Sequence, residues 1–282
     1  MTAPANAVAD RLTVVCHGLV AAVRPADGQV LELIGPLLAM GAAPHQHGNV
    51  HATYTWSHAM DDAGHQLHVV SMRCACTPHR RRVARVRDPR EAADLLARDL
   101  EYRAALHARD RLFVHAAAVA WHGRAILVPG RSFSGKTTLA AALVRQGAAY
   151  LSDEYAVLDE DGLVHPFPRP LRLRDATGAQ IGRAHVEELG GTRGDRAVPV
   201  GLVLSTTHRD GAAWRPREMA PGEMALAMLA NTVVARLRPA YALRVVARAV
   251  DGVVGLAGPR GDADETARSL LERASAAWAP GS

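Results

Sequence analysis

Short runs that combine apolar and β-branched residues with single polar residues recur in the first hundred positions, a pattern typical of strands. Such runs occur at residues 12–15, 53–56 and 67–70. Turn residues separate them, among them Asp27-Gly28 and Ala63-Gly64. The pattern predicts a small, mainly antiparallel sheet.

A helical period follows this β-like region. Pro89 opens a stretch, reaching about Arg109, in which apolar residues recur at the spacing of one helix face. These residues are Ala92, Leu95, Leu96, Leu100 and Ala104. The sequence therefore predicts a small β-rich N-terminal domain that ends in a helix and spans residues 1–110.

The rest of the chain alternates strand-like and helical segments. Apolar runs predict strands at residues 113–121, 124–129, 149–151, 155–158 and 198–205. Helices are expected over residues 137–146, 221–237, 239–249 and 262–278, three of which begin at a proline or an aspartate cap. This alternation predicts an α/β domain over residues 111–282.

Composition narrows the class of protein. The chain has 282 residues, of which 49% are hydrophobic and 22% charged, so it is long and apolar enough to bury a core. It has no apolar run of the roughly 18–20 residues that a membrane span needs. The first residues, Met1 to Pro4, lack the basic and apolar regions of a signal peptide, and three cysteines are too few for a disulfide framework. We expect a soluble cytoplasmic protein without a membrane partner.

Nearly all of the basic residues are arginines, and they are spread along the whole chain. Lys136 is the single lysine among 33 lysines and arginines, and the net charge is +5. Because the arginines are scattered, nucleic acid is not expected as a partner. The run Arg80-Arg81-Arg82 is expected to form an exposed turn, with docking of a peptide or phosphate as the alternative.

The segment Gly130-Arg131-Ser132-Phe133-Ser134-Gly135-Lys136-Thr137 matches the Walker A pattern G-x-x-x-x-G-K-[ST] at every fixed position. A strand precedes it and a helix follows, as a loop that wraps phosphate with backbone N–H groups requires. Lysine supplies charge to the phosphates, and the next hydroxyl binds Mg²⁺. The motif predicts nucleotide binding by Gly130, Ser132, Phe133, Ser134, Gly135, Lys136, Thr137 and Thr138.

Two carboxylates and a histidine are candidates for the chemistry. Asp153 and Glu154 follow a predicted strand beside the phosphate loop, where one can bind Mg²⁺ and the other accept a proton. An acidic turn is the structural alternative. His115 lies in the strand that precedes the strand of the loop, and its alternative is a half-buried structural histidine.

Residues from about His115 to Leu173 resemble the HPr kinase/phosphorylase family and its wider group of HPr-kinase-like proteins. The similarity rests on the histidine strand, the Walker A loop, a helix ending at Arg145-Gln146-Gly147, and Ser152-Asp153-Glu154. It implies a P-loop kinase core of the HPr kinase/phosphoenolpyruvate carboxykinase type. It also implies catalytic roles for Lys136, for Asp153 as the base and for His115 as its assistant. Thr137, Asp153 and Glu154 would bind Mg²⁺.

The stretch Pro166–Pro170 and the Leu-Arg-Leu-Arg that follows resemble HPr-kinase-like proteins of peptide-modification clusters, including lasso-peptide tailoring kinases. The family's acidic pair is usually Asp-Asp, whereas the second member here is Glu154. Its glycine-rich signature is missing, and Glu187 and Glu188 are a candidate substitute for the metal ligand. The resemblance thus implies a phosphotransferase more strongly than it implies HPr as the substrate.

These observations together predict an ATP- and Mg²⁺-dependent transfer of the γ-phosphate to a hydroxyl, with serine or threonine of a peptide or small protein as acceptor. A precursor peptide such as a lasso-peptide precursor is one such acceptor. A small-molecule kinase and a nucleotide-binding regulator with weak ATPase activity stay open as alternatives, as does a homo-oligomeric state. Zinc binding by His45, His47, His51, Cys74, Cys76 and His79 is disfavoured, because C-x-C is a poor spacing for a structural zinc site.

Overall fold

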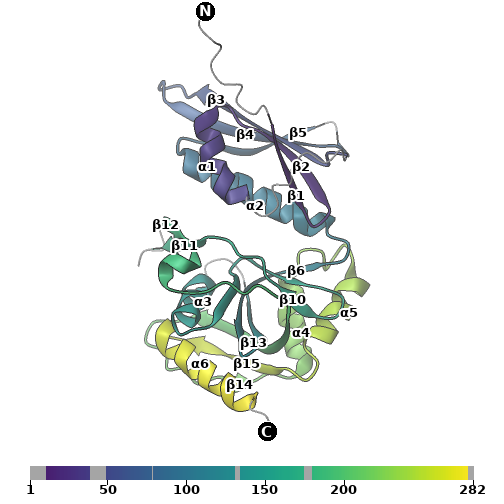
Figure 1. The fold of residues 1–282 in the computed structure, drawn as a ribbon, viewed down its shortest axis with the longest axis vertical. Coiled ribbons are helices and arrows are strands. Elements are labelled where there is room, and N and C mark those ends of the chain that lie inside the picture. Colours follow the sequence, from purple (N-terminus) through teal and green to yellow (C-terminus); the bar gives the residue numbers. More distant parts are fainter. Residues whose placement is uncertain (1–10, 39–48, 78, 131–133, 175–179, 279–282) are drawn as a thin grey trace, which may run out of the picture. The chain divides into compact units, whose positions relative to one another are not determined.

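The computed structural model describes residues 11–38, 49–77, 79–130, 134–174 and 180–278. The chain divides into two compact units, Met1–Arg109 and Asp110–Ser282. Each unit has its own sheet and its own helices (Figure 1). No helix among the described residues is long and apolar enough to cross a lipid bilayer.

The first unit is a sheet covered by two helices. Its elements are β1 (Leu12–Cys16), β2 (Leu19–Arg24), α1 (Gly28–Leu38), β3 (Ala52–Met60), β4 (Gln66–Cys74), β5 (Arg80–Val86) and α2 (Pro89–His107). The strands pair in the order β1-β2-β3-β4-β5, and all neighbours are antiparallel except β2 and β3. The prediction of a mainly antiparallel sheet followed by a helix is confirmed.

Two local interpretations in this unit were wrong. Asp27-Gly28 is the start of α1 and not a turn between strands, because the Asp27 carboxylate accepts a hydrogen bond from the Val30 N–H (2.8 Å) and caps the helix. The arginine run is exposed as expected, but Arg80–Arg82 opens strand β5 instead of forming a turn, because it pairs with β4.

The second unit surrounds a larger sheet with helices. Its elements are β6 (Leu112–Trp121), β7 (Arg124–Pro129), α3 (Lys136–Arg145), β8 (Ala149–Ser152), β9 (Tyr155–Leu158), β10 (Leu163–His165), β11 (Leu171–Arg174), β12 (Gln180–Ala184), the 3-10 turn η1 (Val186–Leu189), β13 (Val198–His208), β14 (Arg217–Glu218), α4 (Pro221–Ala230), α5 (Pro239–Ala249), β15 (Val254–Arg260) and α6 (Ala263–Ala277). The α/β character predicted for this region is confirmed.

The larger sheet mixes strand directions. Its order is β10-β9-β6-β7-β13-β15-β14, with β8 also paired to β6 and β10 also paired to β13. The strands β7, β13 and β15 are parallel neighbours, so their carboxyl ends lie along one edge. Ligands of open α/β sheets bind beyond such an edge, so the candidate site is sought there.

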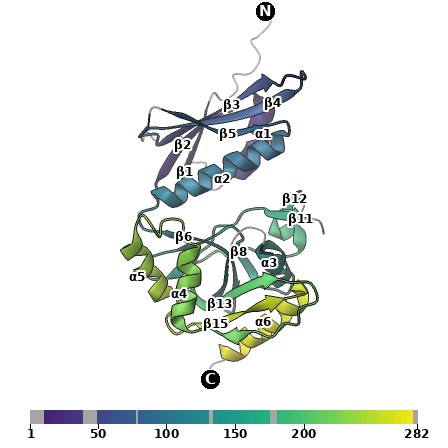
Figure 2. The same cartoon turned by 180° about the vertical axis from the view of Figure 1, so that it is seen from behind.

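Helices α3 and α6 share a buried core with the sheet (Figure 2). Leu139 and Leu143 of α3 and Leu270 of α6 are fully buried together with Ile126 of β7 and Leu204 of β13. Burying a side chain of this size contributes about 1.5–3 kcal/mol relative to exposure. This core fixes the start of α3 against the end of β7.

One predicted helix is too long. The pattern predicts a helix over residues 221–237, but α4 ends at Ala230. Beyond it the backbone pairs with β6: the Asn231 carbonyl accepts from the His115 N–H (2.7 Å), and the Val233 N–H donates to the Phe113 carbonyl (3.0 Å). This pairing ends the helix although the following residues keep a helical apolar period.

Candidate functional site

A loop at the carboxyl edge of the sheet connects β7 to α3. It is anchored at its start, where the Gly130 N–H donates to the His115 carbonyl of β6 (3.2 Å). It ends at Gly135, which precedes α3 in the left-handed conformation (φ 82°) that glycine adopts without a steric cost. Arg131, Ser132 and Phe133 lie outside the described residues, so the predicted contacts of Ser132 and Phe133 are not part of the structural description.

The start of α3 and the end of the loop present polar groups. The Leu139 N–H makes the first helical hydrogen bond, to the Gly135 carbonyl, so the N–H groups of the preceding turn point out of the helix end. The Ser134 hydroxyl oxygen is buried and has no hydrogen-bond partner among the described residues. A Cβ on Gly130 would come within 3.2 Å of that oxygen. The glycine and the orphaned hydroxyl fit a loop shaped for an anion.

Lys136 turns back into this loop. Its side chain is buried, and its Nζ donates to the Gly130 carbonyl (2.7 Å). Burial lowers the pKa of the ammonium group from its usual value, while the charges of Glu154 and Asp153 act in the opposite direction. The lysine therefore lies close to both predicted carboxylates, although they follow a different strand.

Asp153 is held on both of its oxygens. It follows β8 and is buried, with the Tyr150 hydroxyl donating to Oδ1 (2.9 Å) and the Thr137 hydroxyl donating to Oδ2 (3.2 Å). Hydrogen bonds of this kind favour a carboxylate in its charged form. Thr137, the last residue of the motif, is thereby joined to the acidic pair.

The sequence analysis missed Tyr150. Burial and the neighbouring Asp153 raise the pKa of its hydroxyl well above the usual value, so it stays protonated and remains a donor. The same hydroxyl also lies 3.0 Å from the Arg169 carbonyl, which brings the proline-rich stretch 166–170 alongside β8. A tyrosine at a strand centre gives no sequence signal beyond that of a core residue.

His115 lies beside the second carboxylate. Its Nε2 is 3.4 Å from Glu154 Oε1, and its ring packs edge-on against the ring of Tyr155 at 5.9 Å. Sequence analysis assigns His115 to orienting Asp153, whereas the geometry gives it an ion-pair distance to Glu154 and gives Asp153 the hydroxyls of Tyr150 and Thr137. The assignment of roles among these residues stays a prediction.

Arg260 completes the site from the last strand of the sheet and was also missed. Its guanidinium, at the end of β15, is 2% exposed and donates to the carbonyls of Gly135 (2.8 Å) and Gly261 (3.2 Å). Burial lowers its pKa, and its Nε is buried without a partner among the described residues. A Cβ on Gly135 would collide with this guanidinium. Arg260 therefore holds the end of the loop through the Gly135 carbonyl.

The donor set fits Mg²⁺ and a polyphosphate. Thr137 and Asp153 present a hydroxyl and a carboxylate oxygen side by side, which is the hard oxygen chemistry that Mg²⁺ prefers. Mg²⁺ keeps several waters or phosphate oxygens as ligands, so two protein ligands suffice. Among the described residues, no group of three or more His, Cys, Asp and Glu side chains is arranged to hold a metal ion by itself.

The other candidate metal ligands have different partners. Glu187 pairs with Arg193 (2.7 Å), and Glu188 Oε1 accepts from the His185 N–H (3.0 Å) at the start of η1. These local contacts favour a structural role at a helix end for both glutamates.

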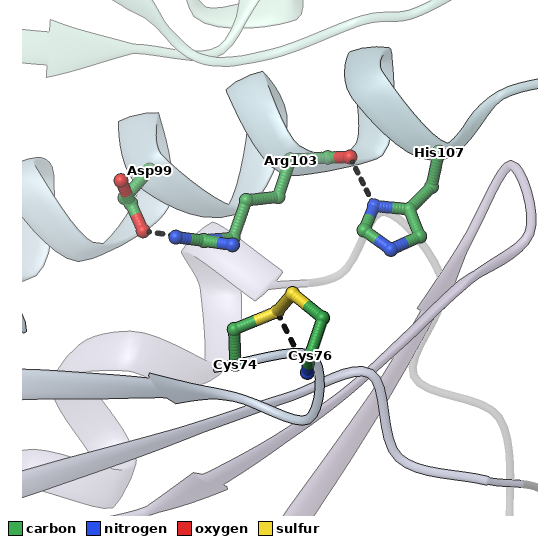
Figure 3. Close-up of a disulfide and its surroundings, with 5 residues drawn as sticks. All are labelled: Cys74, Cys76, Asp99, Arg103 and His107. Atoms are coloured by element: carbon green, nitrogen blue, oxygen red, sulfur yellow. Dashed lines mark hydrogen bonds and ion pairs between the residues drawn. A yellow bond between two sulfur atoms is a disulfide. The ribbon is translucent and has the colours of Figure 1, made fainter. Parts of the chain in front are cut away.

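The cysteines considered for zinc are joined to each other. Figure 3 shows the disulfide between Cys74, the last residue of β4, and Cys76. The same view shows the Asp99–Arg103 pair of α2 nearby. Cys16 is a buried free thiol. His51 accepts a hydrogen bond from the Val20 N–H at its Nδ1 (2.9 Å), and His45 and His47 lie outside the described residues.

Comparisons with known proteins add little to this geometry. No family model matches the chain, and no curated protein matches it in sequence. Among solved structures, it is similar to the Hpr(Ser) kinase/phosphatase from Coxiella burnetii at 15% identity and a TM-score of 0.34, covering 57% of this chain and 94% of that one. At this distance the match carries no information on residue roles, so the site is judged on its own contacts.

Proposed function

We propose that the unit Asp110–Ser282 is a phosphotransferase domain that binds ATP with Mg²⁺ at Gly130–Thr138 and transfers the γ-phosphoryl group to a hydroxyl. The observation that carries this proposal is that Lys136, Thr137 and Asp153 lie together at the start of α3, where the Thr137 hydroxyl donates to Asp153. The Walker A spacing supports it from the sequence, since each fixed position of the pattern is present.

Each residue has a stated task in this proposal. The N–H groups at the start of α3 and the Lys136 ammonium bind the phosphates, and Thr137 and Asp153 hold the metal. Bound Mg²⁺ supplies neutralisation of the phosphate charge. Lys136 exchanges its bond to the Gly130 carbonyl for one to a phosphate oxygen, which a flexible side chain does without moving the loop.

Asp153 also serves as the base. Its carboxylate accepts the proton of the acceptor hydroxyl as that oxygen forms a bond to the γ-phosphorus, and the bond from phosphorus to the bridging oxygen breaks with its electron pair leaving on ADP. Tyr150 keeps the carboxylate oriented and charged. Glu154 and His115, whose Oε1 and Nε2 lie 3.4 Å apart, are the residues proposed to face the acceptor.

The acceptor in this proposal is serine or threonine of a peptide or small protein. The basis is the resemblance of residues 115–173 to HPr-kinase-like proteins of peptide-modification clusters. The acceptor rests on this resemblance, whereas the donor site rests on the residue contacts described above.

The test is incubation of the full chain with [γ-³²P]ATP and Mg²⁺, alone and with peptides encoded beside its gene. We expect label on a peptide hydroxyl that is lost with EDTA and reduced about 1,000-fold by Asp153→Asn, a range typical of removing a catalytic base. Asp251→Asn, an exposed aspartate of the same unit, is the matched control and should retain full transfer.

Other outcomes redirect the proposal. Label on free serine, a sugar or a nucleoside but on no peptide would identify a small-molecule kinase. ATP binding by the wild type without labelling of any acceptor would favour a nucleotide-binding regulator and reject the transfer step assigned to Asp153.

A further inference from the structure

One face of the sheet in the first unit carries no helix. Both α1 and α2 lie on the opposite face in Figures 1 and 2, where Tyr54 and Trp56 of β3 are buried. The alternate residues of β3 point away from the helices, since successive side chains of a strand lie on opposite faces. This surface, called the open face below, carries the hydroxyl residues Thr53, Thr55 and Ser57.

Arginines flank these hydroxyls on the neighbouring strands. One cross-strand row runs from Arg24 of β2 through Thr55 and Ser71 to Arg82 of β5. The next row joins Thr53 to Arg73 of β4 and Arg80 of β5, and a third joins Ser57 and Val69 to Arg85. Paired residues share a face of the sheet, so all five arginines lie on the open face: Arg24, Arg73, Arg80, Arg82 and Arg85.

The charge of this face is of one sign. The five strands of the sheet contain no aspartate or glutamate. Among the described residues, none of the five arginines has an acidic partner within 4.0 Å, whereas Arg81, on the covered face of the same strand, pairs with Asp99 of α2. Like charges placed this close together repel, so the face is favourable only toward an anion.

A hollow in the open face has the chemistry of an anion site. It has a volume of about 320 Å³ and is lined by Arg24, Arg73 and Arg80 as well as by Thr53 and Thr55. Guanidinium groups bind carboxylates with two parallel hydrogen bonds, and threonine hydroxyls donate further ones. The threonines lie on a strand between those that carry the arginines. One anion can therefore contact both a hydroxyl and a guanidinium group.

We propose that the open face is a docking surface for an acidic peptide segment. Five strands about 4.8 Å apart extend over about 19 Å, which an extended segment of about six residues covers. The aromatic residues Tyr54 and Trp56 lie on the covered face, so the open face lacks the stacking platform that single-stranded nucleic acids use. Carboxylate side chains of a peptide match the arginines in charge and in geometry.

The test is fluorescence anisotropy of a labelled hexaglutamate peptide, with a hexaglutamine peptide as the uncharged counterpart, on the full chain at low salt. The variant Arg73→Gln/Arg80→Gln should bind hexaglutamate about 4- to 9-fold more weakly, as loss of two exposed charges worth about two- to three-fold each implies. The matched control is Arg268→Gln/Arg273→Gln on the exposed side of α6, which removes the same charge and should change affinity by less than about two-fold.

Several results would overturn the proposal. These are no binding of hexaglutamate, equal binding of hexaglutamine, and equal losses in the two double variants. Tighter binding of a 20-nucleotide DNA that the same Arg73/Arg80 variant abolishes would replace the peptide with nucleic acid. Arg24→Gln/Arg82→Gln provides a second, independent variant, and circular dichroism checks that each variant is folded.

This proposal stands apart from the phosphotransferase proposal. Docking requires neither nucleotide nor the carboxylate of Asp153, so Asp153→Asn should bind hexaglutamate with wild-type affinity. A docking failure with intact phosphate transfer, or the reverse, therefore identifies which of the two proposals is wrong.

Discussion

The two units use positive charge in opposite ways. In the second unit, Lys136 and Arg260 are buried, and each donates to a backbone carbonyl of the loop between β7 and α3. In the first unit, five arginines of the open face are exposed and share no acidic partner among the described residues. A buried cation contributes through the specific hydrogen bonds that it donates. Exposed cations contribute through the total charge of the surface, and salt screens that contribution. Single substitutions should therefore separate the two regions.

The largest effect on ATP binding is expected for Lys136→Ala. The lost ammonium contact to a phosphate is worth about 1.5–3 kcal/mol, so ATP binding should weaken by about 10- to 150-fold. Isothermal titration calorimetry measures it, with Arg145→Ala at the exposed end of the same helix as the control. In Asp153→Asn the affinity for ATP should stay within about three-fold, because the amide keeps an oxygen ligand for Mg²⁺ and the phosphate contact of Lys136 is unchanged. Equal losses of binding in Lys136→Ala and Asp153→Asn would contradict the separate roles.

Gly135→Ala should lower stability next most strongly. Its left-handed conformation costs any other residue about 1 kcal/mol or more, and the added Cβ would also meet the Arg260 guanidinium. We expect a loss of about 2 kcal/mol in the free energy of unfolding, measured by chemical denaturation. Gly252→Ala, at φ 65° with open space around its Cβ, is the matched control and should cost about 1 kcal/mol. Equal costs would mean that Arg260 moves aside freely.

Tyr150→Phe should shift the pH dependence of transfer. The Tyr150 hydroxyl donates to Asp153 Oδ1, and such a bond favours the charged form of a carboxylate, so its removal favours the protonated form. Because the base acts when deprotonated, the acidic limb of kcat/KM should move to higher pH. Tyr54→Phe, which removes a similar bond to Asp99 in the first unit, should leave the profile unchanged. An unshifted pH profile in Tyr150→Phe would mean that Tyr150 does not influence the catalytic base.

Single arginines of the open face should give the smallest effects. Each substitution of Arg24, Arg73 or Arg80 by glutamine should weaken hexaglutamate binding by about two- to three-fold, as expected for exposed charges. The effects should add and should fade as salt rises, since the Debye length is about 10 Å at 0.1 M. A single substitution that abolishes binding at all salt concentrations would mean that one arginine acts as a buried contact, and the contrast between the units would fail.

The sequence predicted correctly those helices whose start is determined by neighbouring residues. Helix α2 has a proline at its start and an aspartate cap, Asp88, which accepts from the Arg90 N–H at 2.8 Å. Helix α6 has the same kind of cap in Asp262. In both cases the residues that begin the helix lie within a few positions of the start, so a sequence pattern contains them.

Predictions failed where a distant segment decides. Residues 231–233 keep the apolar spacing of α4, yet their backbone pairs with β6 and leaves the helix. Arg260 was missed because its importance lies in a hydrogen bond to Gly135 that spans 125 positions of sequence. Tyr150 lies only three positions from Asp153, but a tyrosine in an apolar strand gives no sign of which group its hydroxyl contacts. The proposed phosphate loop could be predicted because its glycines, lysine and threonine lie within eight positions of sequence. The residues that hold the loop and the carboxylate lie outside that stretch, so the motif does not reveal them.

The bond between Arg260 and the Gly135 carbonyl also bears on when the site forms during synthesis. The ribosome releases the loop, its helix and both carboxylates long before it reaches β15. Contacts between positions so far apart in the chain close slowly, because loop closure costs entropy first. The emerging chain thus has the residues of the motif before it has Arg260, whose hydrogen bond holds the Gly135 end of the loop. ATP capture should accordingly begin only after translation has passed Arg260.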